Sequence, residues 1–248
     1  MSLVVHADFG SPACYLASRR ADVLGAAGVP VDWRAVDADP RLPMGGGRTD
    51  VAERDAVDRE FDLLDRLLLP GEELPRSART FRPNTRGAVS GYAEAYEAGV
   101  ADDVRRLLFT AYWVHGADIG SPETLRRLLA GPLLRGHSTS VPVSEFGYVV
   151  SSSRGPITTG AFRLIRDWST QWETLQVPTL PLLVVDGRLA VSGETALRRL
   201  EKEIRRVGAR IDPGLPDPGR YPAVDDRPAS SWVSENGGRW RHSWMAGA

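Results

Sequence analysis

Hydrophobic and polar residues alternate at the start of the chain, and a helical period follows after a short break. Residues 2–7 alternate loosely, residues 8–12 have the composition of a turn, and apolar residues recur at helical spacing through residues 15–27. Residues 29–36 are a second strand candidate. A strand, a helix and a strand within roughly 35 residues predict a βαβ unit with parallel strands and a right-handed crossover.

The same kinds of segment return in the second half of the chain. They are, in order, a helix at 158–175, a strand at 180–185, a strand at 189–191 and a helix at 194–207. Asp186 and Gly187 separate the two strands, and both residue types adopt the positive φ of a type I′ turn at low cost. The pattern predicts a hairpin followed by a final helix.

Four amphipathic stretches lie between these halves and are separated by proline and glycine. They are residues 49–69, 86–99, 101–116 and 122–129. The last begins clearly at Ser-Pro-Glu, residues 121–123, which supplies a capping hydroxyl, a proline and an acid to the first turn of a helix. We therefore expect a helical insertion at 41–135 within a discontinuous α/β domain at 1–40 and 136–211.

The final segment, residues 212–248, differs in composition from the rest. It is rich in Pro, Gly and Asp but carries Trp232, Trp240 and Trp244. Large apolar rings in such a tail predict that it docks on an apolar surface, and we favour the protein's own domain over a partner chain.

Composition narrows the classes of function. With 42% apolar and 25% charged residues over 248 positions, the chain can bury a sizeable core. The 31 basic and 32 acidic residues give a net charge of −1, without the basic surplus that binds a nucleic-acid backbone. No apolar run approaches the ~20 residues of a membrane span, and residues 1–8 lack the pattern of a secretory signal. We expect a cytoplasmic protein that binds neither nucleic acid nor membranes.

The cysteine and histidine content limits the candidate chemistry. Cys14 is the only cysteine, so the chain can form neither an internal disulfide nor a thiolate metal cluster. The four histidines lack metal-binding spacing, and no metal is predicted. His6 and His115 fall in a predicted strand and a predicted helix, and we interpret them as packed rather than catalytic.

The predicted order of elements is that of a thioredoxin fold interrupted by helices, and motifs across residues 1–207 resemble the DsbA-like family. Residues 8–16, DFGSPACYL, resemble the family's active-site turn, DFxCPWCYL. Residues 81–88, FRPNTRGA, are similar to FPxNTxxA, and residues 107–119 contain LLFTAYW and GADI, similar to LFxAYF and GxDI. Residues 180–187, LPLLVVDG, resemble VPTFVVDG. The resemblance implies an α/β thioredoxin fold with a large all-helical insertion.

Ser11 replaces the first cysteine of that turn, so a disulfide oxidant working with two thiols is not expected. Serine followed by proline resembles another branch of the superfamily, the 2-hydroxychromene-2-carboxylate isomerases and kappa-class glutathione transferases. That resemblance implies that the serine hydroxyl donates a hydrogen bond to the sulfur of bound glutathione. Residues 193–196, GETA, depart from that branch's GSDR or GQDR and lack its aspartate. We therefore expect glutathione or another low-molecular-weight thiol as the cofactor.

Ser11 and Pro12 also stand where a predicted strand leads into a predicted helix. Free N–H groups and the positive end of the helix dipole favour an anion there, and they lower the pKa of a thiol. The alternative is purely structural, because serine as N-cap and proline at the first helical position are common at helix starts. We favour a sulfur-binding site to which Pro12 contributes.

The other candidate residues each have a functional and a structural interpretation. Cys14 is either a reactive thiol or a small buried apolar residue. Asn84 either lines a cleft between domains or caps the helix that follows it. The resemblance implies that Pro181 is cis and faces the turn at residues 11–12, which leaves the backbone of Leu180 free to pair with an extended ligand. Trans prolines at a strand entrance are the alternative.

Three functions follow from these interpretations. The first is thiol-dependent isomerase or transferase chemistry on a small electrophile, with Ser11 as the catalytic donor. The second is a monothiol thiol-disulfide oxidoreductase acting through Cys14, and the third is a non-catalytic binding module. The resemblance favours an enzyme whose partners are a small-molecule thiol and an electrophile. A homodimer is left open.

Overall fold

The computed structural model describes residues 1–75, 81–136 and 140–211. The predicted tail with its three tryptophans lies outside the described residues. Within those residues, no helix is long and apolar enough to cross a membrane.

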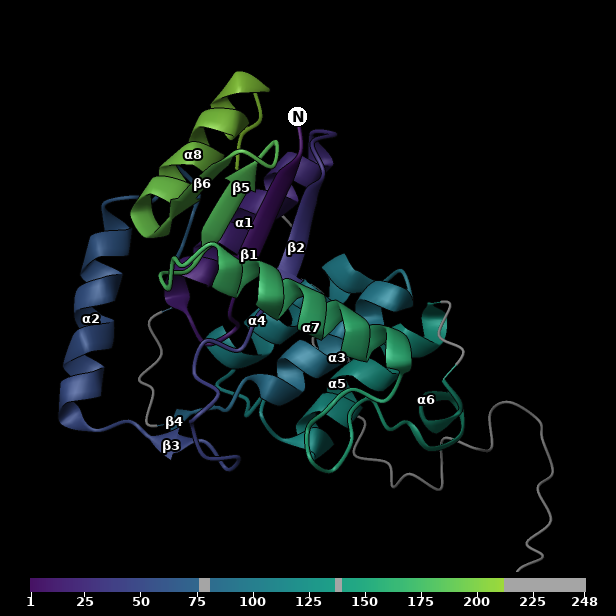
Figure 1. The fold of residues 1–248 in the computed structure, drawn as a ribbon. Coiled ribbons are helices and arrows are strands. Elements are labelled where there is room, and N and C mark those ends of the chain that lie inside the picture. The colour runs from purple at the N-terminus through teal and green to yellow at the C-terminus, as the bar shows by residue number, and fades with distance from the viewer. Residues whose placement is uncertain (76–80, 137–139, 212–248) are drawn as a thin grey trace, which may run out of the picture.

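A four-stranded mixed sheet forms the centre of one part of the molecule (Figure 1). Its strands are β1 (Leu3–Ala7), β2 (Val31–Ala35), β5 (Leu182–Val185) and β6 (Leu189–Ser192), in the spatial order β2-β1-β5-β6. β1 runs parallel to β2 with Leu3 opposite Val31, as the βαβ pattern predicted. β5 runs antiparallel to β1 and to β6. The order and directions of the four strands are those of a thioredoxin fold.

Helices cover the sheet and build a second layer beside it. They are α1 (Pro12–Ala26), α2 (Val51–Asp65), α3 (Arg86–Glu97), α4 (Ala101–Trp113), α5 (Pro122–Arg135), α6 (Val141–Phe146), α7 (Thr159–Thr174) and α8 (Gly193–Arg206). α1 packs against α8 behind the sheet, and α7 crosses in front of it, in contact with β2 and α3 (Figure 1). A two-stranded ribbon, β3 (Gly47–Arg48) with β4 (Phe81–Arg82), lies near the start of α2.

Aromatic side chains join the sheet to the helical layer. Phe9, which follows β1, lies 4.9 Å from Phe109 of α4 and 5.8 Å from Tyr92 of α3, measured between ring centroids. Trp33 of β2 contacts Phe109 at 5.8 Å. The Trp113 indole also donates a hydrogen bond of 2.9 Å to the Phe9 carbonyl. The segment between β1 and α1 is therefore fixed on the helical layer as well as on the sheet.

Two buried arginines fasten α1 to its neighbours. Arg20 donates to both carboxylate oxygens of Glu72, at 2.8 and 2.7 Å, and to the Leu197 carbonyl of α8 at 2.8 Å. Arg105 of α4 donates to the Ser18 carbonyl at 2.8 Å and to the Asp22 carboxylate at 2.6 Å. A guanidinium that is paired with a carboxylate is tolerated in a protein interior, whereas an unpaired one is not. α1 is thus held from two sides.

Most predicted elements are present, with shifted ends. The hairpin is confirmed, because Asp186 and Gly187 both have positive φ, 51° and 65°. The strand predicted from residue 180 begins only at Leu182. The helix predicted at 122–129 continues to Arg135 with a proline inside it. His115 lies beyond α4 and is exposed, so its predicted placement in a packed helix is wrong.

The domain boundaries stay a prediction. α6 packs on α5 and α7 packs on α3, although the predicted boundary at residue 136 assigns α6 and α7 to the thioredoxin-like part.

Candidate functional site

The candidate site is the turn between β1 and α1. Ser11 is the N-cap of α1, with φ −100° and ψ 128°, and its Oγ accepts a hydrogen bond of 3.3 Å from the Cys14 N–H. Pro12 is buried at the first helical position, where its missing N–H costs nothing. Capping uses only an oxygen lone pair of the half-buried Ser11 hydroxyl, so its O–H can donate as well, and the Cys14 sulfur is one acceptor next to it.

Asp8 holds this turn in place, a role that the sequence analysis did not assign. Its buried carboxylate accepts hydrogen bonds from the Gly10 N–H (2.6 Å), the Ala38 N–H (2.9 Å) and the Thr85 hydroxyl (2.8 Å). Burial raises the pKa of Asp8, while these three donors oppose that rise. Asp8 therefore connects the turn after β1, the loop after β2 and the start of α3.

Cys14 lies one helical turn beyond Ser11 and is completely buried. Burial raises the pKa of its thiol to about 12, although a hydrogen bond with Ser11 opposes the rise. A thiol in these surroundings is neither accessible nor ionised at neutral pH, and the thiolate is the form that reacts. The geometry favours the structural interpretation of Cys14 over the reactive one.

Glu60 of α2 is a second residue that sequence reasoning missed. It lies on the side of α2 that carries the buried Phe61 and Leu64, and its carboxylate accepts a hydrogen bond from the backbone N–H of Ala13. Desolvation raises the pKa of Glu60. Ala13 is in the first turn of α1, so a carboxylate of the protein itself already interacts with the end of the helix that attracts anions.

The Leu180–Pro181 peptide bond is cis, as predicted. Leu182 pairs with His6, so Pro181 stands at the edge of the sheet where β1 leads into the candidate turn. The Pro181 carbonyl accepts a hydrogen bond of 2.9 Å from the Gly193 N–H. In contrast, the N–H and carbonyl of Leu180 have no hydrogen-bond partner among the described residues. Leu180 keeps the backbone groups that an extended ligand would need.

Asn84 is buried, and both polar atoms of its side-chain amide form a hydrogen bond within the protein. Its Nδ2 donates to the Leu42 carbonyl at 2.7 Å, and its Oδ1 accepts from the Arg86 N–H at 3.1 Å. The second bond satisfies the N–H of the first residue of α3, which agrees with the structural alternative given above, although the N-cap itself is Thr85. This arrangement favours a role in fixing the start of α3 and the loop around Leu42 over direct ligand binding.

A mixed sheet of this topology, a large helical insertion and a cis-proline at the edge beside the start of α1 together define a DsbA-like thioredoxin fold. No family model matches the sequence, and no curated protein matches it either.

Solved structures with the same fold span nearly the whole described chain. A probable DsbA oxidoreductase from Streptomyces coelicolor is 18% identical at a TM-score of 0.63, covering 86% of this chain and 92% of its own. A 2-hydroxychromene-2-carboxylate isomerase is 20% identical at 0.57, covering 84% and 96%. The cytosolic disulfide reductase DsbM from Pseudomonas aeruginosa is 16% identical at 0.54, covering 83% and 100%. These likenesses establish the DsbA-like thioredoxin fold of the chain.

Proposed function

We propose that the protein is an enzyme that acts on a small electrophile with the help of a low-molecular-weight thiol. It either isomerises the electrophile or transfers the thiol to it. The observation that carries the proposal is the Ser11 hydroxyl at the start of α1, at the edge of the sheet that also holds the cis Pro181. Members of the same fold include an isomerase and the disulfide reductase DsbM, one structure of which was solved with GSH. The cytoplasm, where small thiols stay reduced, suits this activity.

The proposed chemistry begins with binding of the thiol. Its sulfur lies at the start of α1, where the helix dipole and the donated O–H of Ser11 stabilise the thiolate and lower its pKa. The free N–H and carbonyl of Leu180 pair with the backbone of an extended thiol ligand. These interactions orient the sulfur toward an electrophile bound between the sheet and the helical layer, where ligand sites are common.

The thiolate then adds to an electrophilic carbon of the substrate. A carbon–sulfur bond forms, and the electron pair of the attacked double bond moves onto the substrate, which takes up a proton. In isomerisation the altered adduct loses that proton and expels the thiolate, so the thiol is regenerated. In transfer the thioether is the product. Neither route changes the oxidation state of the protein, and neither needs a thiol of the chain.

The identity of the thiol is open between glutathione and another small thiol. Gly193 and Glu194 stand where the glutathione-dependent branch has Gly-Ser or Gly-Gln, and the aspartate of that branch is replaced by Thr195. The Glu194 carboxylate pairs with Arg198 at 2.8 Å on the surface of α8. A panel of thiols is therefore needed in any binding test.

Calorimetric titration of the parent protein and matched variants tests the proposal. Ser11→Gly removes the hydroxyl but retains most of the capping preference, so it separates ligand binding from helix stability. We expect thiol affinity to fall by the ~1.5 to 3 kcal/mol of a charge-assisted hydrogen bond in Ser11→Gly and Ser11→Ala. Cys14→Ala and the surface control Ser144→Ala should bind as the parent does.

Two results would reject this function. Loss of affinity in Cys14→Ala with unchanged affinity in Ser11→Gly would favour the monothiol oxidoreductase. Normal thiol binding without turnover across a panel of activated aryl halides and conjugated enones would favour the non-catalytic binding module.

A further inference from the structure

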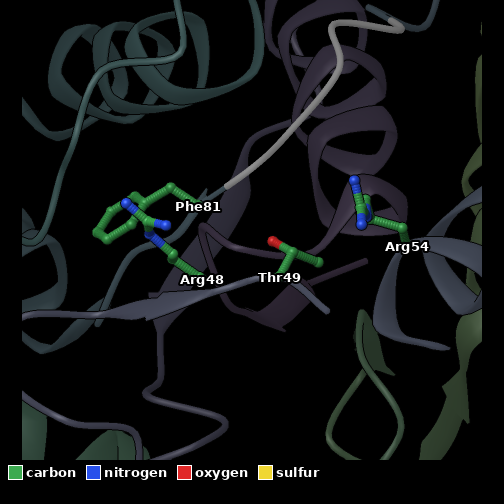
Figure 2. Close-up of a pocket in the computed structure, with 4 residues that line it drawn as sticks. All are labelled: Arg48, Thr49, Arg54 and Phe81. Carbon is green, nitrogen blue, oxygen red and sulfur yellow. The ribbon is translucent and has the colours of Figure 1, made fainter. Parts of the chain in front are cut away.

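A hollow of about 460 Å³ lies beside the ribbon of β3 and β4. It is lined by Arg48 of β3, by Thr49 in the loop that follows, by Arg54 of α2 and by Phe81 of β4 (Figure 2). Its volume is within the range of small-molecule sites. No motif in the sequence pointed to it.

The aromatic wall of the hollow is positioned by its neighbours. Phe81 pairs with Arg48 across the ribbon, so their side chains leave on the same face. The ring lies against Gly46, which has φ +74°, and a Cβ at that position would overlap the ring and the Arg82 carbonyl. Tyr112 of α4 donates a hydrogen bond of 3.4 Å to the Phe81 carbonyl. Both the ring and its backbone are thus fixed before any ligand arrives.

The two guanidinium groups of the hollow lack acidic partners. In the described part of the chain, neither Arg48 nor Arg54 forms an ion pair, whereas Arg82, on the opposite face of the ribbon, pairs with Asp39 at 3.2 Å. Arg54 uses its Nε to donate to the Asp50 carbonyl at 3.3 Å, and its terminal nitrogens have no hydrogen-bond partner among the described residues.

The acidic groups nearest in sequence are already engaged. The Asp50 carboxylate accepts from the Glu53 N–H at 2.8 Å, and the Glu53 carboxylate accepts from the Asp50 N–H at 3.1 Å, so together they cap α2. Two positive charges in one concavity therefore remain available to a ligand, beside the Thr49 hydroxyl and a fixed ring.

We propose that this hollow is a second binding site, for a small oxyanion carried on a flat apolar body. A guanidinium presents paired N–H groups that match two oxygens of a carboxylate or phosphate. The Phe81 ring supplies a surface that an inorganic ion would not use but an aryl or planar conjugated group would. The source of the oxyanion, a carboxylic acid or a phosphate ester, is distinguished by the probes below. None of the four residues that line the hollow belongs to the proposed thiol site at Ser11.

Calorimetry on the full chain tests the proposal with three probes: benzoate, phenyl phosphate and inorganic phosphate. We expect one of the two aryl anions to bind more tightly than inorganic phosphate, and to bind equally well to the parent and to Ser11→Gly. Arg48→Met and Arg54→Met should each weaken that binding by about tenfold or more. Arg59→Met, which removes another exposed arginine of α2, is the matched control and should have no effect.

A further variant examines the aromatic wall. Phe81→Ala should reduce the affinity for the aryl anion to that for inorganic phosphate, while circular dichroism and the melting temperature confirm that the variant is folded. Equal binding of inorganic phosphate and the aryl probes by the parent would overturn the proposal and indicate an adventitious ion only. Unchanged aryl-anion affinity in both arginine variants would also overturn it. Failure of thiol binding at Ser11 affects neither outcome, because these probes contain no sulfur.

Discussion

The Thr85 hydroxyl donates a hydrogen bond of 2.8 Å to the Asp8 carboxylate across a separation of 77 residues. Both groups are buried, and the bond joins the turn that carries Ser11 to the first residues of α3. A buried carboxylate has lost its hydrogen bonds to water, so it needs several hydrogen-bond donors from the protein. Asp8 obtains them from three different segments, so the position of the candidate site depends on the correct docking of the helical layer.

Thr85→Val tests this dependence. The substitution keeps the side-chain shape but removes one of the three donors to a buried carboxylate, so we expect the free energy of unfolding to fall by about 1–3 kcal/mol. Thr174→Val is the control, because its hydroxyl donates to the Thr170 carbonyl on the exposed surface of α7. Urea unfolding of both variants is the measurement. Equal stability of the two would show that Asp8 does not need the Thr85 donor.

Ser11→Cys is expected to create dithiol redox activity. It would place a thiol at the start of α1, where the helix end lowers its pKa, three residues before Cys14 as in the family's cysteine pair. We predict background rates of insulin reduction for the parent and at least roughly tenfold faster reduction for the variant, owing to the larger thiolate fraction. Cys14→Ser in the same background should remove the gain. Robust activity of the unaltered protein would contradict the proposed role of Ser11.

Glu60→Gln should strengthen binding of a thiolate at Ser11. The variant removes a carboxylate that interacts with the same helix end, so repulsion of about 1 kcal/mol, or roughly fivefold in affinity, should be relieved. The difference should disappear toward acidic pH, because the raised pKa of Glu60 lets this carboxyl protonate above its usual range. Titrations at several pH values, with Asp58→Asn on the exposed side of α2 as control, measure the effect. Weaker binding in Glu60→Gln would mean that Glu60 helps to hold the ligand.

The buried His6 should make the free energy of unfolding depend on pH. Burial lowers its pKa from 6.5 to about 4, with a smaller contribution from Arg34. Between these values the unfolded chain binds a proton that the folded protein does not bind, so the stability associated with His6 is lost as the pH falls from 6.5 to about 4.

The variant His6→Gln cannot take up that proton. Relative to the variant, the parent should lose about 2 kcal/mol of unfolding free energy between pH 7.5 and pH 4.5. Urea unfolding at the two pH values gives this double difference, in which the contributions of other titrating groups cancel. If parent and variant lost the same unfolding free energy between the two pH values, His6 would have to be solvated or paired in the folded state.

The periodic elements of the fold could be predicted from the sequence because each has its own hydrophobic pattern. β1, α1 and β2 were predicted with parallel strands, and the hairpin at Asp186 was predicted from turn chemistry. The two-residue strands β3 and β4 have no period to detect. α5 continues past Gly131 and Pro132 because Leu133 is buried, so tertiary packing outweighed the local break.

The candidate site was only partly predictable. Ser11 and Pro181 were found because motifs mark them, and the fold places both at one edge of the sheet. Asp8 and Glu60 acquire their roles from donors far along the chain, which a local pattern does not contain. The same holds for the hollow, where Arg48 and Phe81 meet only after the ribbon pairs.

The buried contacts of Arg20 and Arg105 affect the entropy of ligand binding at Ser11. Both side chains fasten α1, and Asp8 fixes the turn before it, so the donor at Ser11 is immobilised in the free protein. When a ligand binds to a donor that is already fixed, the ligand loses conformational entropy but the protein loses little. The binding entropy at this end of α1 should therefore be governed by the ligand's rotatable bonds and by released water. Among thiols that reach both Ser11 and Leu180, a stiff one will therefore bind more tightly than one with many rotatable bonds.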